Sequence, residues 1–378
     1  MSILGIYVRF KWTLISVRDY FIFLFKYKKI LSNNKKNILI FSHDASNKGG
    51  APVVLINLLK NLPLNNYNVF IFFKQGGGLL KEAKATGYYP FVYQYLSSWY
   101  LKLLKKHTDC VLVNTVICAD VVDRVQKSMN CPIVWWIHEE GSLFESMKKK
   151  LPKNLKSNVR LLCVSEVSKI ATEQYLPQAR PQIMFYGVED SYQPYSRPDN
   201  SFFEICVVGM LSERKNQMQI LDMLNCLSTC YREKIHVKVV AGTWNADYKA
   251  SFLNRLDDFP EVEFIAGLKH DEVLELYKQT DLLLCCSKQD PLPVVVTEAL
   301  MMECLCLVSS GCGQYQYLKN GQNGYCYDVD SVSDLCSKII EIMDNEHLND
   351  IAVAGRQVYI KKFSMQHASS EMSKKLGI

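Results

Sequence analysis

The sequence predicts a two-domain α/β protein in which each domain is built on a parallel sheet. The chain length, the composition and a repeated alternation of short apolar runs with helical patterns lead to this prediction. A chain of 378 residues is too long to fold around one ordinary hydrophobic core. Its hydrophobic fraction of 48% and charged fraction of 22% are those of a soluble globular protein. Strand patterns that alternate with helical ones are typical of parallel sheets.

The predicted first domain covers residues 37–187. Its helical patterns include residues 51–62 and 119–128, which lie between apolar runs of strand length. The apolar runs that we interpret as strands are residues 37–42, 69–73, 110–115, 133–137 and 160–165.

A polar stretch at residues 188–201, which contains Pro194 and Pro198, is predicted to be an interdomain linker. The alternation then restarts in a second domain, residues 202–362. Two sheets joined in this way are expected to face each other across a cleft, and open α/β sheets bind ligands at the carboxyl ends of their strands. The predicted strands of this domain are residues 204–208, 237–241, 262–265, 281–285 and 306–309.

Positive charge is concentrated at the N-terminus, although the formal net charge of the whole chain is only +6. Residues 1–36 contain eight basic residues and the single acid Asp19, so the rest of the chain is close to neutral. A nearly neutral body argues against nucleic acid as a partner, because nucleic-acid-binding domains are strongly basic.

The N-terminal segment, residues 1–36, interleaves its basic residues with aromatic ones. Its uncharged runs are far shorter than the roughly 18 apolar residues of a membrane span, and it shows no signal-peptide cleavage pattern. Basic and aromatic residues together are typical of a segment that lies in the headgroup region of an anionic membrane. We therefore expect a peripheral contact with the inner face of the membrane. The alternative is a helix packed on the body of the protein.

The chain has 14 cysteines, but their placement argues against a disulfide framework. Cys163, Cys206, Cys285 and Cys286 lie inside apolar runs, where cysteine behaves as a small hydrophobic residue. No C-x-x-C pair is present for a structural zinc ion. We therefore predict reduced thiols and a cytoplasmic protein.

Two candidate site elements belong to the first domain. The turn at residues 42–52 (SHDASNKGGAP) contains Gly49 and Gly50, which let the backbone approach a ligand at the start of a helix. It lacks the G-x-G-x-x-G pattern of a dinucleotide site, and a plain strand-to-helix turn is the alternative. His138 follows an apolar strand, so it is predicted to face the cleft and to hydrogen-bond a sugar hydroxyl, although local backbone could also satisfy it.

The opening turn of the second domain, residues 209–217, contains the adjacent cations Arg214 and Lys215. Adjacent fixed cations suit a departing nucleoside diphosphate, because negative charge builds on its leaving oxygen. Cations are unfavourable at a helix N-terminus, so their presence there indicates an anion nearby. The alternative is a solvated pair at the start of a helix.

The strongest candidate is the segment QDPLPVVVTEAL at residues 289–300. Seven residues separate Asp290 from Glu298, and Pro291 and Pro293 prevent helix until about Val294. Two carboxylates at this place could receive the hydroxyls of a ribose and a hexose. The alternative is that these acids only complement the positive N-terminus of a helix.

Two further segments have sequences that resemble anion-binding or metal-binding turns. Residues 310–313 (SGCG) form a turn that could hold an anion beside the carboxylates. Residues 328–330 spell D-x-D, the metal motif of glycosyltransferases of another fold. A helical pattern begins directly after them, so we interpret Asp330 or Ser331 as its N-cap and not as a metal ligand.

Together these residues resemble family 4 of the retaining GT-B glycosyltransferases over residues 37–378. The E-x7-E signature of that family appears as DPLPVVVTEA at residues 290–299, with Asp290 in place of the first Glu. The segments SHDAS at residues 42–46 and WIHE at residues 136–139 look like a branch found among capsule and O-antigen enzymes. Glu303 is a departure, since Gly is common there.

The resemblance implies a GT-B fold of two Rossmann-like domains, with a C-terminal helix at residues 363–378 that crosses back to the first domain. It implies transfer of a hexose-type sugar, with retention, from a nucleotide sugar to a polysaccharide or a lipid-linked glycan. No metal and no cofactor are expected. The implied donor-binding residues are Gly50, Arg214, Lys215, Leu268, Val294, Val295 and Glu298, of which Arg214 and Lys215 would hold the diphosphate and Glu298 the ribose. The implied catalytic residues are His138, near the anomeric centre, and Asp290, near the donor sugar or the acceptor.

Three alternatives remain at this point. A nucleotide-sugar epimerase also uses a two-domain cleft of this kind, but it would need acid–base residues on both sides of the sugar carbon. A non-catalytic protein that binds a sugar nucleotide or docks on a membrane is the second alternative. A dinucleotide oxidoreductase is the weakest, because the glycine fingerprint is missing.

Overall fold

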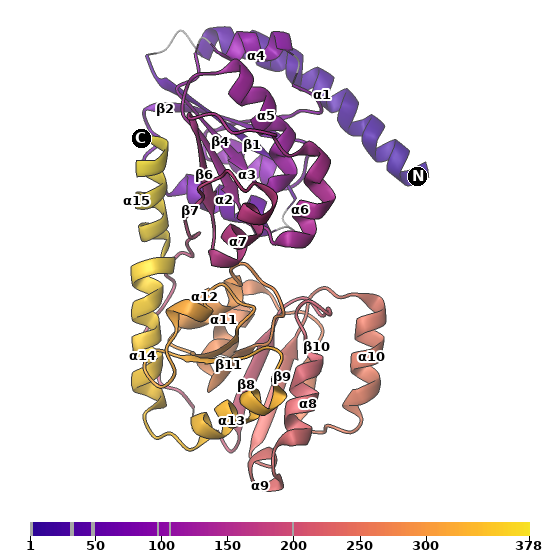
Figure 1. The fold of residues 1–378 in the computed structure, drawn as a ribbon, viewed down its shortest axis with the longest axis vertical. Coiled ribbons are helices and arrows are strands. Elements are labelled where there is room, and N and C mark those ends of the chain that lie inside the picture. The colour runs from indigo at the N-terminus through magenta and orange to yellow at the C-terminus, as the bar shows by residue number, and fades with distance from the viewer. Residues whose placement is uncertain (1–2, 31–33, 47–49, 97, 106, 199) are drawn as a thin grey trace. The chain divides into compact units, whose positions relative to one another are not determined.

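Two separate parallel sheets organise the chain in the computed structural model (Figure 1). The structure describes residues 3–30, 34–46, 50–96, 98–105, 107–198 and 200–378. Residues 1–187 and 368–378 form one compact unit, which we call unit 1, and residues 188–367 form unit 2. Each unit is described by itself below.

Unit 1 contains a seven-stranded parallel sheet in the order β3-β2-β1-β4-β5-β6-β7. Its strands are β1 (Lys36–Ser42), β2 (Tyr67–Phe73), β3 (Tyr89–Val92), β4 (Cys110–Asn114), β5 (Ile133–Ile137), β6 (Val159–Cys163) and β7 (Gln182–Ile183). Its helices are α1 (Ile3–Ile30), α2 (Gly50–Lys60), α3 (Leu79–Ala85), α4 (Ser98–Lys105), α5 (Ala119–Ser128), α6 (Gly141–Met147) and α7 (Glu166–Tyr175).

Unit 2 contains a six-stranded parallel sheet in the order β10-β9-β8-β11-β12-β13. Its strands are β8 (Phe203–Val208), β9 (Ile235–Val240), β10 (Val262–Ile265), β11 (Leu282–Cys285), β12 (Leu305–Ser309) and β13 (Tyr325–Tyr327). Its helices are α8 (Met218–Cys226), α9 (Thr229–Arg232), α10 (Ala246–Leu256), α11 (His270–Lys278), α12 (Val294–Met301), α13 (Val332–Met343) and α14 (Leu348–Val358). Helices flank both sheets, and the prediction of two parallel α/β domains is confirmed (Figure 1).

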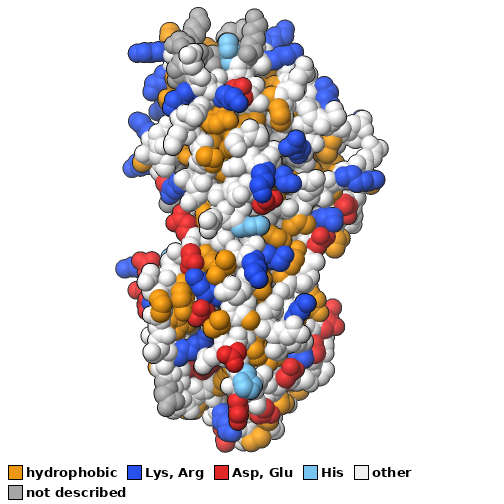
Figure 2. Space-filling view, turned by 90° about the vertical axis from the view of Figure 1, so that its left-hand side faces the viewer, with side chains coloured by type: hydrophobic (Ala, Val, Ile, Leu, Met, Phe, Trp, Pro, Cys, Tyr) orange, Lys and Arg blue, Asp and Glu red, His pale blue; other side chains and the backbone are white. Residues whose placement is uncertain are grey.

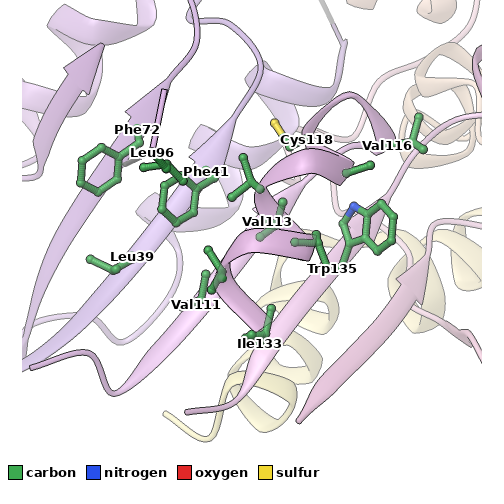
Figure 3. Close-up of a cluster of buried hydrophobic side chains, with 14 of the residues drawn as sticks. Leu39, Phe41, Phe72, Leu96, Val111, Val113, Val116, Cys118, Ile133 and Trp135 are labelled. Carbon is green, nitrogen blue, oxygen red and sulfur yellow. The ribbon is translucent and has the colours of Figure 1, made fainter. Parts of the chain in front are cut away.

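The core of unit 1 explains why its strands appear in the sequence as continuous apolar runs. Side chains that alternate along β1, β2, β4 and β5 meet on one face of the sheet, and Figure 3 shows this cluster. The residues between them are also buried, because helices cover the other face. The clustered side chains labelled in Figure 3 include Leu39, Phe41, Phe72, Val111, Val113, Ile133 and Trp135.

Every predicted strand is present to within two residues at each end, but three edge strands were not predicted. These are β3, β7 and β13, which are only two to four residues long and contain polar or half-buried positions. β3 also contains Pro90, which an edge strand tolerates because one side of its backbone needs no ladder hydrogen bonds. Short edge strands carry too little apolar sequence to be recognised by pattern.

The described residues of the expected linker, 188–198 and 200–201, belong to unit 2 and pack against it. The Asp190 carboxylate lies 2.7 Å from the Arg356 guanidinium, and the Tyr192 hydroxyl donates to Glu303 at 2.6 Å. Glu303 adopts a left-handed φ of 55°, which explains why Gly is the easier residue at this position. In this chain the Glu303 carboxylate instead accepts the hydrogen bond that fixes Tyr192.

The C-terminal residues return to unit 1. A π-helical turn at Tyr359–Phe363 is followed by α15 (Met365–Leu376), whose residues from 368 onward belong to unit 1. Arg160 Nη1 donates to the Lys375 carbonyl at 2.9 Å, and Lys375 Nζ donates to Gln182 Oε1 at 2.7 Å. Helix α15 is therefore fixed beside β6 and β7.

All 14 cysteines are free thiols, and most of them are buried. None of the helices in the described ranges is long and apolar enough to cross a membrane.

Candidate functional site

The topology of unit 2 marks one place in its sheet for a ligand. From β8 the chain adds β9 and β10 on one side of the sheet. It then returns to the other side of β8 and adds β11, β12 and β13, so the strand order reverses between β8 and β11. Open α/β sheets bind ligands at such switch points, beyond the carboxyl ends of the strands. The turn after β8 carries Arg214 and Lys215, and the loop after β11 carries Asp290. The three predicted residues therefore meet at the switch point of this sheet.

Asp290 forms ion pairs with both cations. Lys215 Nζ forms a short contact with Asp290 Oδ2, and Arg214 Nη1 lies 3.6 Å from the same oxygen. Arg214 also donates to the Gln289 carbonyl at 2.9 Å, which holds its guanidinium against the loop. The side chains of Lys215 and Asp290 are 14% and 11% exposed, whereas that of Arg214 is 44% exposed.

The electrostatics of this cluster favour an anion. Burial is the largest single effect and would lower the pKa of Lys215, but the charge of Asp290, the neighbouring Cys285 and the hydrogen bond to Asp290 together raise that pKa above its ordinary value. Lys215 is therefore held as a buried ammonium group, and Arg214 is always charged. Two cations face one carboxylate, so the cluster carries an excess positive charge.

The loop that carries Asp290 is fixed by its own backbone. The amide of Asp290 donates to the Gly311 carbonyl at 2.8 Å, and the amide of Gly313 donates to the Asp290 carbonyl at 2.9 Å. A side chain on Gly311 would lie only 2.2 Å from the Lys288 carbonyl, so no other residue fits there. The turn at residues 310–313 thus braces the carboxylate loop.

Glu298 lies on α12, which begins at Val294 as predicted from the two prolines. It is not part of the Asp290 cluster: its Oε1 lies 2.8 Å from Nε2 of His270, at the start of α11. The Glu298 side chain is almost fully buried, while His270 is largely exposed. His270 was not predicted, because nothing local distinguishes it and only folding brings it to Glu298.

The His270–Glu298 pair should make the stability of unit 2 depend on pH. The hydrogen bond to Glu298 raises the pKa of His270 above its ordinary value of 6.5. The pair therefore stabilises the fold fully below about pH 6.5, and that contribution is lost as the pH rises through the raised pKa.

We expect the melting temperature of the wild type to exceed that of His270→Asn by more at pH 5.5 than at pH 8.5. Thermal unfolding at both pH values measures this difference. His347→Asn is the control, because the pair of His347 with Asp350 is longer, at 3.7 Å, and fully exposed to solvent, and it should show a clearly smaller widening. An equal difference at both pH values would contradict the assigned pair.

The remaining predicted donor residues also lie in unit 2. Val294 and Val295 form the first turn of α12 and are partly exposed. Leu268 lines a surface cavity of about 480 Å³ together with residues of β10 and α11. Gly267 before it has a φ of 88°, in the left-handed region that favours glycine, and a side chain there would make only an ordinary contact with Gly242. Backbone conformation, and not lack of space, therefore favours glycine at this turn.

The D-x-D spelling at residues 328–330 has a structural role. Ser331 caps α13 by accepting the amide of Asp334, and Asp328 accepts the amide of Asp330 at 3.1 Å. Within the described part of the chain, no three His, Cys, Asp or Glu residues are grouped to hold a metal ion.

Unit 1 has its own switch point, between β1 and β4, and His138 lies close to it. His138 Nε2 lies 2.9 Å from Asn114 Oδ1, at the end of β4, and its ring is 4.4 Å from that of Trp136. Because an amide oxygen only accepts, Nε2 carries the proton and Nδ1 is an acceptor. Burial lowers the pKa of His138 to about 3, so the imidazole is neutral at ordinary pH. A neutral imidazole can accept a hydrogen bond from a hydroxyl.

Asn114 connects His138 to the glycine-rich turn. Its Nδ2 donates to the Ala51 carbonyl at 3.1 Å, in the first turn of α2, which begins at Gly50. Gly49 lies outside the described residues. Asn114 was not predicted, although its place at the carboxyl end of a buried strand is the pattern that would have indicated it.

Glu139 and His43 complete the polar groups at this end of the sheet. Glu139 accepts hydrogen bonds from the amides of Val116 and His138, each at 3.0 Å. These hydrogen bonds lower the pKa of Glu139, but burial has the larger effect and raises it. His43 Nε2 lies 3.0 Å from Asp44, while its buried Nδ1 has no hydrogen-bond partner among the described residues. Thr115 is held at a φ of 73°, a strained value for a β-branched residue. Strain of this kind is common at functional sites.

Both units match glycosyltransferase families. Residues 190–358 match the family model described as Glycosyl transferases group 1, and residues 34–185 match the one described as Glycosyl-transferase family 4. A search of the curated proteins finds no match.

Several solved structures share the fold. HepE from Anabaena in complex with UDP has a TM-score of 0.74 at 16% identity, covering 90% of this chain and 99% of its own. Sucrose-phosphate synthase from Thermosynechococcus elongatus has a TM-score of 0.71 at 13% identity, covering 90% and 98%. The lipopolysaccharide outer core galactosyltransferase WaaB has a TM-score of 0.68 at 14% identity, covering 89% and 98%.

These structural likenesses show the fold, and the two family models, which together span most of the chain, show the class. The chain is therefore a glycosyltransferase of the GT-B type, with a family 4 N-terminal domain and a group 1 C-terminal domain.

Proposed function

We propose that this protein transfers a hexose-type sugar, with retention of configuration, from a nucleoside-diphosphate sugar to a polysaccharide or lipid-linked glycan. The observation that carries the proposal is the cluster of Arg214, Lys215 and Asp290 at the switch point of unit 2. Solved structures of the same fold contain UDP, UDP with glucose, or UDP-glucose, which supports a nucleotide sugar as the donor. Metal independence belongs to the proposal, because two cations can take the diphosphate.

The proposed roles combine the charges of the ionisable residues with what the resemblance to family 4 implies for the others. Arg214 and Lys215 bind the diphosphate and stabilise the charge that develops when the bond from its oxygen to the anomeric carbon breaks. Glu298 accepts the ribose hydroxyls, with Leu268, Val294 and Val295 beside the nucleoside, and Gly50 lies by the phosphates. His138 accepts a hydroxyl of the donor sugar through Nδ1. Asp290, released from one cation when the diphosphate binds, orients the donor sugar or the acceptor.

In the proposed reaction the acceptor hydroxyl attacks the anomeric carbon from the side of the leaving group. Its oxygen forms the new glycosidic bond while the bond to the diphosphate breaks, and its proton passes to the leaving phosphate oxygen. No protein base is then needed, which agrees with the low pKa of His138. We also propose a cytoplasmic enzyme at the inner face of the membrane, where a lipid-linked acceptor would be anchored.

The test is a calorimetric titration with UDP, GDP and dTDP, each with and without EDTA. We expect one of the three to bind and EDTA to leave its affinity unchanged. Incubation of the matching nucleotide sugar with the protein then separates transfer, which releases the nucleoside diphosphate, from epimerisation, which alters the sugar and leaves the nucleotide attached. No binding of any nucleotide, or binding only with an added metal ion, would refute the proposed site.

A further inference from the structure

Helix α1 has two apolar faces, and only one of them is covered. The covered face repeats at helical spacing: Trp12 packs on Gly76, Ser16 Oγ accepts the amide of Gln94, and Phe23 is fully buried. Phe23 touches the rings of Phe70, Phe72, Phe91 and Tyr100. This face explains why α1 is part of unit 1.

The opposite face of α1 exposes a continuous apolar stripe, which we call the outer stripe. Its members follow each other at intervals of three or four residues, so they share one side of the helix over about 22 Å. They are Phe10, Leu14, Val17, Phe21 and Phe25, whose exposed fractions are 62%, 56%, 52%, 54% and 80%. Five large apolar side chains in one exposed row are unusual for a surface that faces only water.

Cations accompany the outer stripe, with no exposed acid in the described part of α1. Lys11, Arg18, Lys26 and Lys29 are exposed on the same helix. The only acid, Asp19, is turned inward, where its carboxylate accepts the amide of Val92 at 2.8 Å and pairs with Arg18 at 2.7 Å. The surface therefore combines apolar side chains with positive charge.

A groove beside α1 adds cations from another part of the chain. It has a volume of about 320 Å³ and lies between α1 and the α3–β3 segment. Arg18 and Lys26 line it from α1, and Lys81 and Lys84 line it from α3. Lys81 and Lys84 are some 55 residues away from Lys26 in the sequence, so only the fold places them here. On the face of unit 1 seen in the upper part of Figure 2, Lys and Arg side chains are scattered.

We propose that the outer stripe and this groove form one docking surface for an anionic phospholipid bilayer. The outer stripe enters the boundary between headgroups and acyl chains with α1 parallel to the membrane plane, and the groove cations receive lipid phosphates. Charge complementarity favours a lipid surface over an apolar protein partner, because the exposed charges on the described part of α1 and in the groove are positive, and Asp19, which also lines the groove, is buried. The inference does not rest on sugar transfer, so nucleotide binding and membrane binding can fail independently.

The test measures co-sedimentation of the full-length protein with vesicles of phosphatidylcholine and phosphatidylglycerol at 7:3, and with phosphatidylcholine alone. We expect binding to the anionic vesicles that weakens as salt rises. The variant Phe21→Ser/Phe25→Ser should lose at least about tenfold in partitioning. The variant Lys26→Gln/Lys81→Gln/Lys84→Gln should lose on the order of 100-fold, at about fivefold for each cation.

Matched controls distinguish binding through this surface from nonspecific electrostatic or hydrophobic binding elsewhere on the protein. Lys149→Gln/Lys150→Gln/Lys153→Gln removes the same charge from an exposed segment of unit 1, and Ile170→Ser/Phe202→Ser removes exposed apolar groups elsewhere. Both should bind as the wild type does. Equal losses in the control and test lysine variants, or no vesicle binding by the wild type, would overturn the proposal. An unchanged melting temperature in each variant shows that it remains folded.

Discussion

Replacing Lys215 with methionine should lower the turnover of sugar transfer by about 100- to 1000-fold, the usual effect of removing one fixed group that stabilises developing negative charge. Lys215 is buried, held charged and directed at the switch point of unit 2, so water cannot substitute for it easily. The measurement is the release of nucleoside diphosphate from the nucleotide sugar that calorimetry identifies, with transfer to water or to a glycan primer. Arg214→Ala should also reduce turnover by orders of magnitude, and its exposure means that the fold should survive.

Loss of Lys215 also leaves Asp290 buried beside a single, more distant cation, so a stability effect must be separated from a catalytic one. We expect Lys215→Met to reduce the free energy of unfolding by on the order of 3 kcal/mol. The double variant Lys215→Met/Asp290→Asn should recover much of that stability without recovering turnover. Lys278→Met, a lysine paired with Glu275 on α11, is the matched control and should leave turnover unchanged. A folded Lys215→Met with normal turnover would exclude the proposed role.

Replacing Glu298 with glutamine should weaken nucleoside-diphosphate binding about 10- to 100-fold. A buried carboxylate that accepts two ribose hydroxyls forms charge-assisted hydrogen bonds, and the loss of about 1.5–3 kcal/mol corresponds to that range. The effect should appear in the dissociation constant from calorimetry, because the ribose is bound equally in the ground state and the transition state.

Two controls define the role of Glu298. Glu341→Gln, an exposed carboxylate on α13 of the same unit, should bind the nucleotide normally. His270→Asn should weaken binding only modestly, since it removes the partner of the carboxylate and not the carboxylate itself. Unaltered affinity in Glu298→Gln would place the nucleoside elsewhere on the protein.

The part of the candidate site that lies within one short segment could be predicted from the sequence. Residues 289–300 could be recognised because Asp290, the two prolines and Glu298 lie within one strand–loop–helix connection, and α12 begins where the prolines require it. The carboxyl end of a buried strand marks Asn114 and His43 as candidates, but nothing local distinguishes His270. Asn114 and His270 matter through His138 and Glu298, which come from other parts of the chain, and a sequence pattern does not record which segments become neighbours.

The same distinction holds for the N-terminal segment. Its composition predicts a membrane contact, with packing on the body of the protein as the alternative. The structure shows α1 packed through Phe23 while its outer stripe stays exposed. Aromatic residues all round the helix gave no single apolar direction, so sequence periodicity could not separate a covered face from an exposed one.

By itself, the sequence determined the two parallel α/β domains and the positions of their central strands, because burial on both faces demands long apolar runs that are visible locally. The tertiary structure alone decided that β1 meets β4 and that β8 meets β11, which creates the two switch points. It also decided that Asp290 pairs with Lys215, that Glu298 pairs with His270, and that Lys81 and Lys84 join the groove of α1. These are contacts between segments distant in sequence, whose energies depend on geometry that no local pattern encodes.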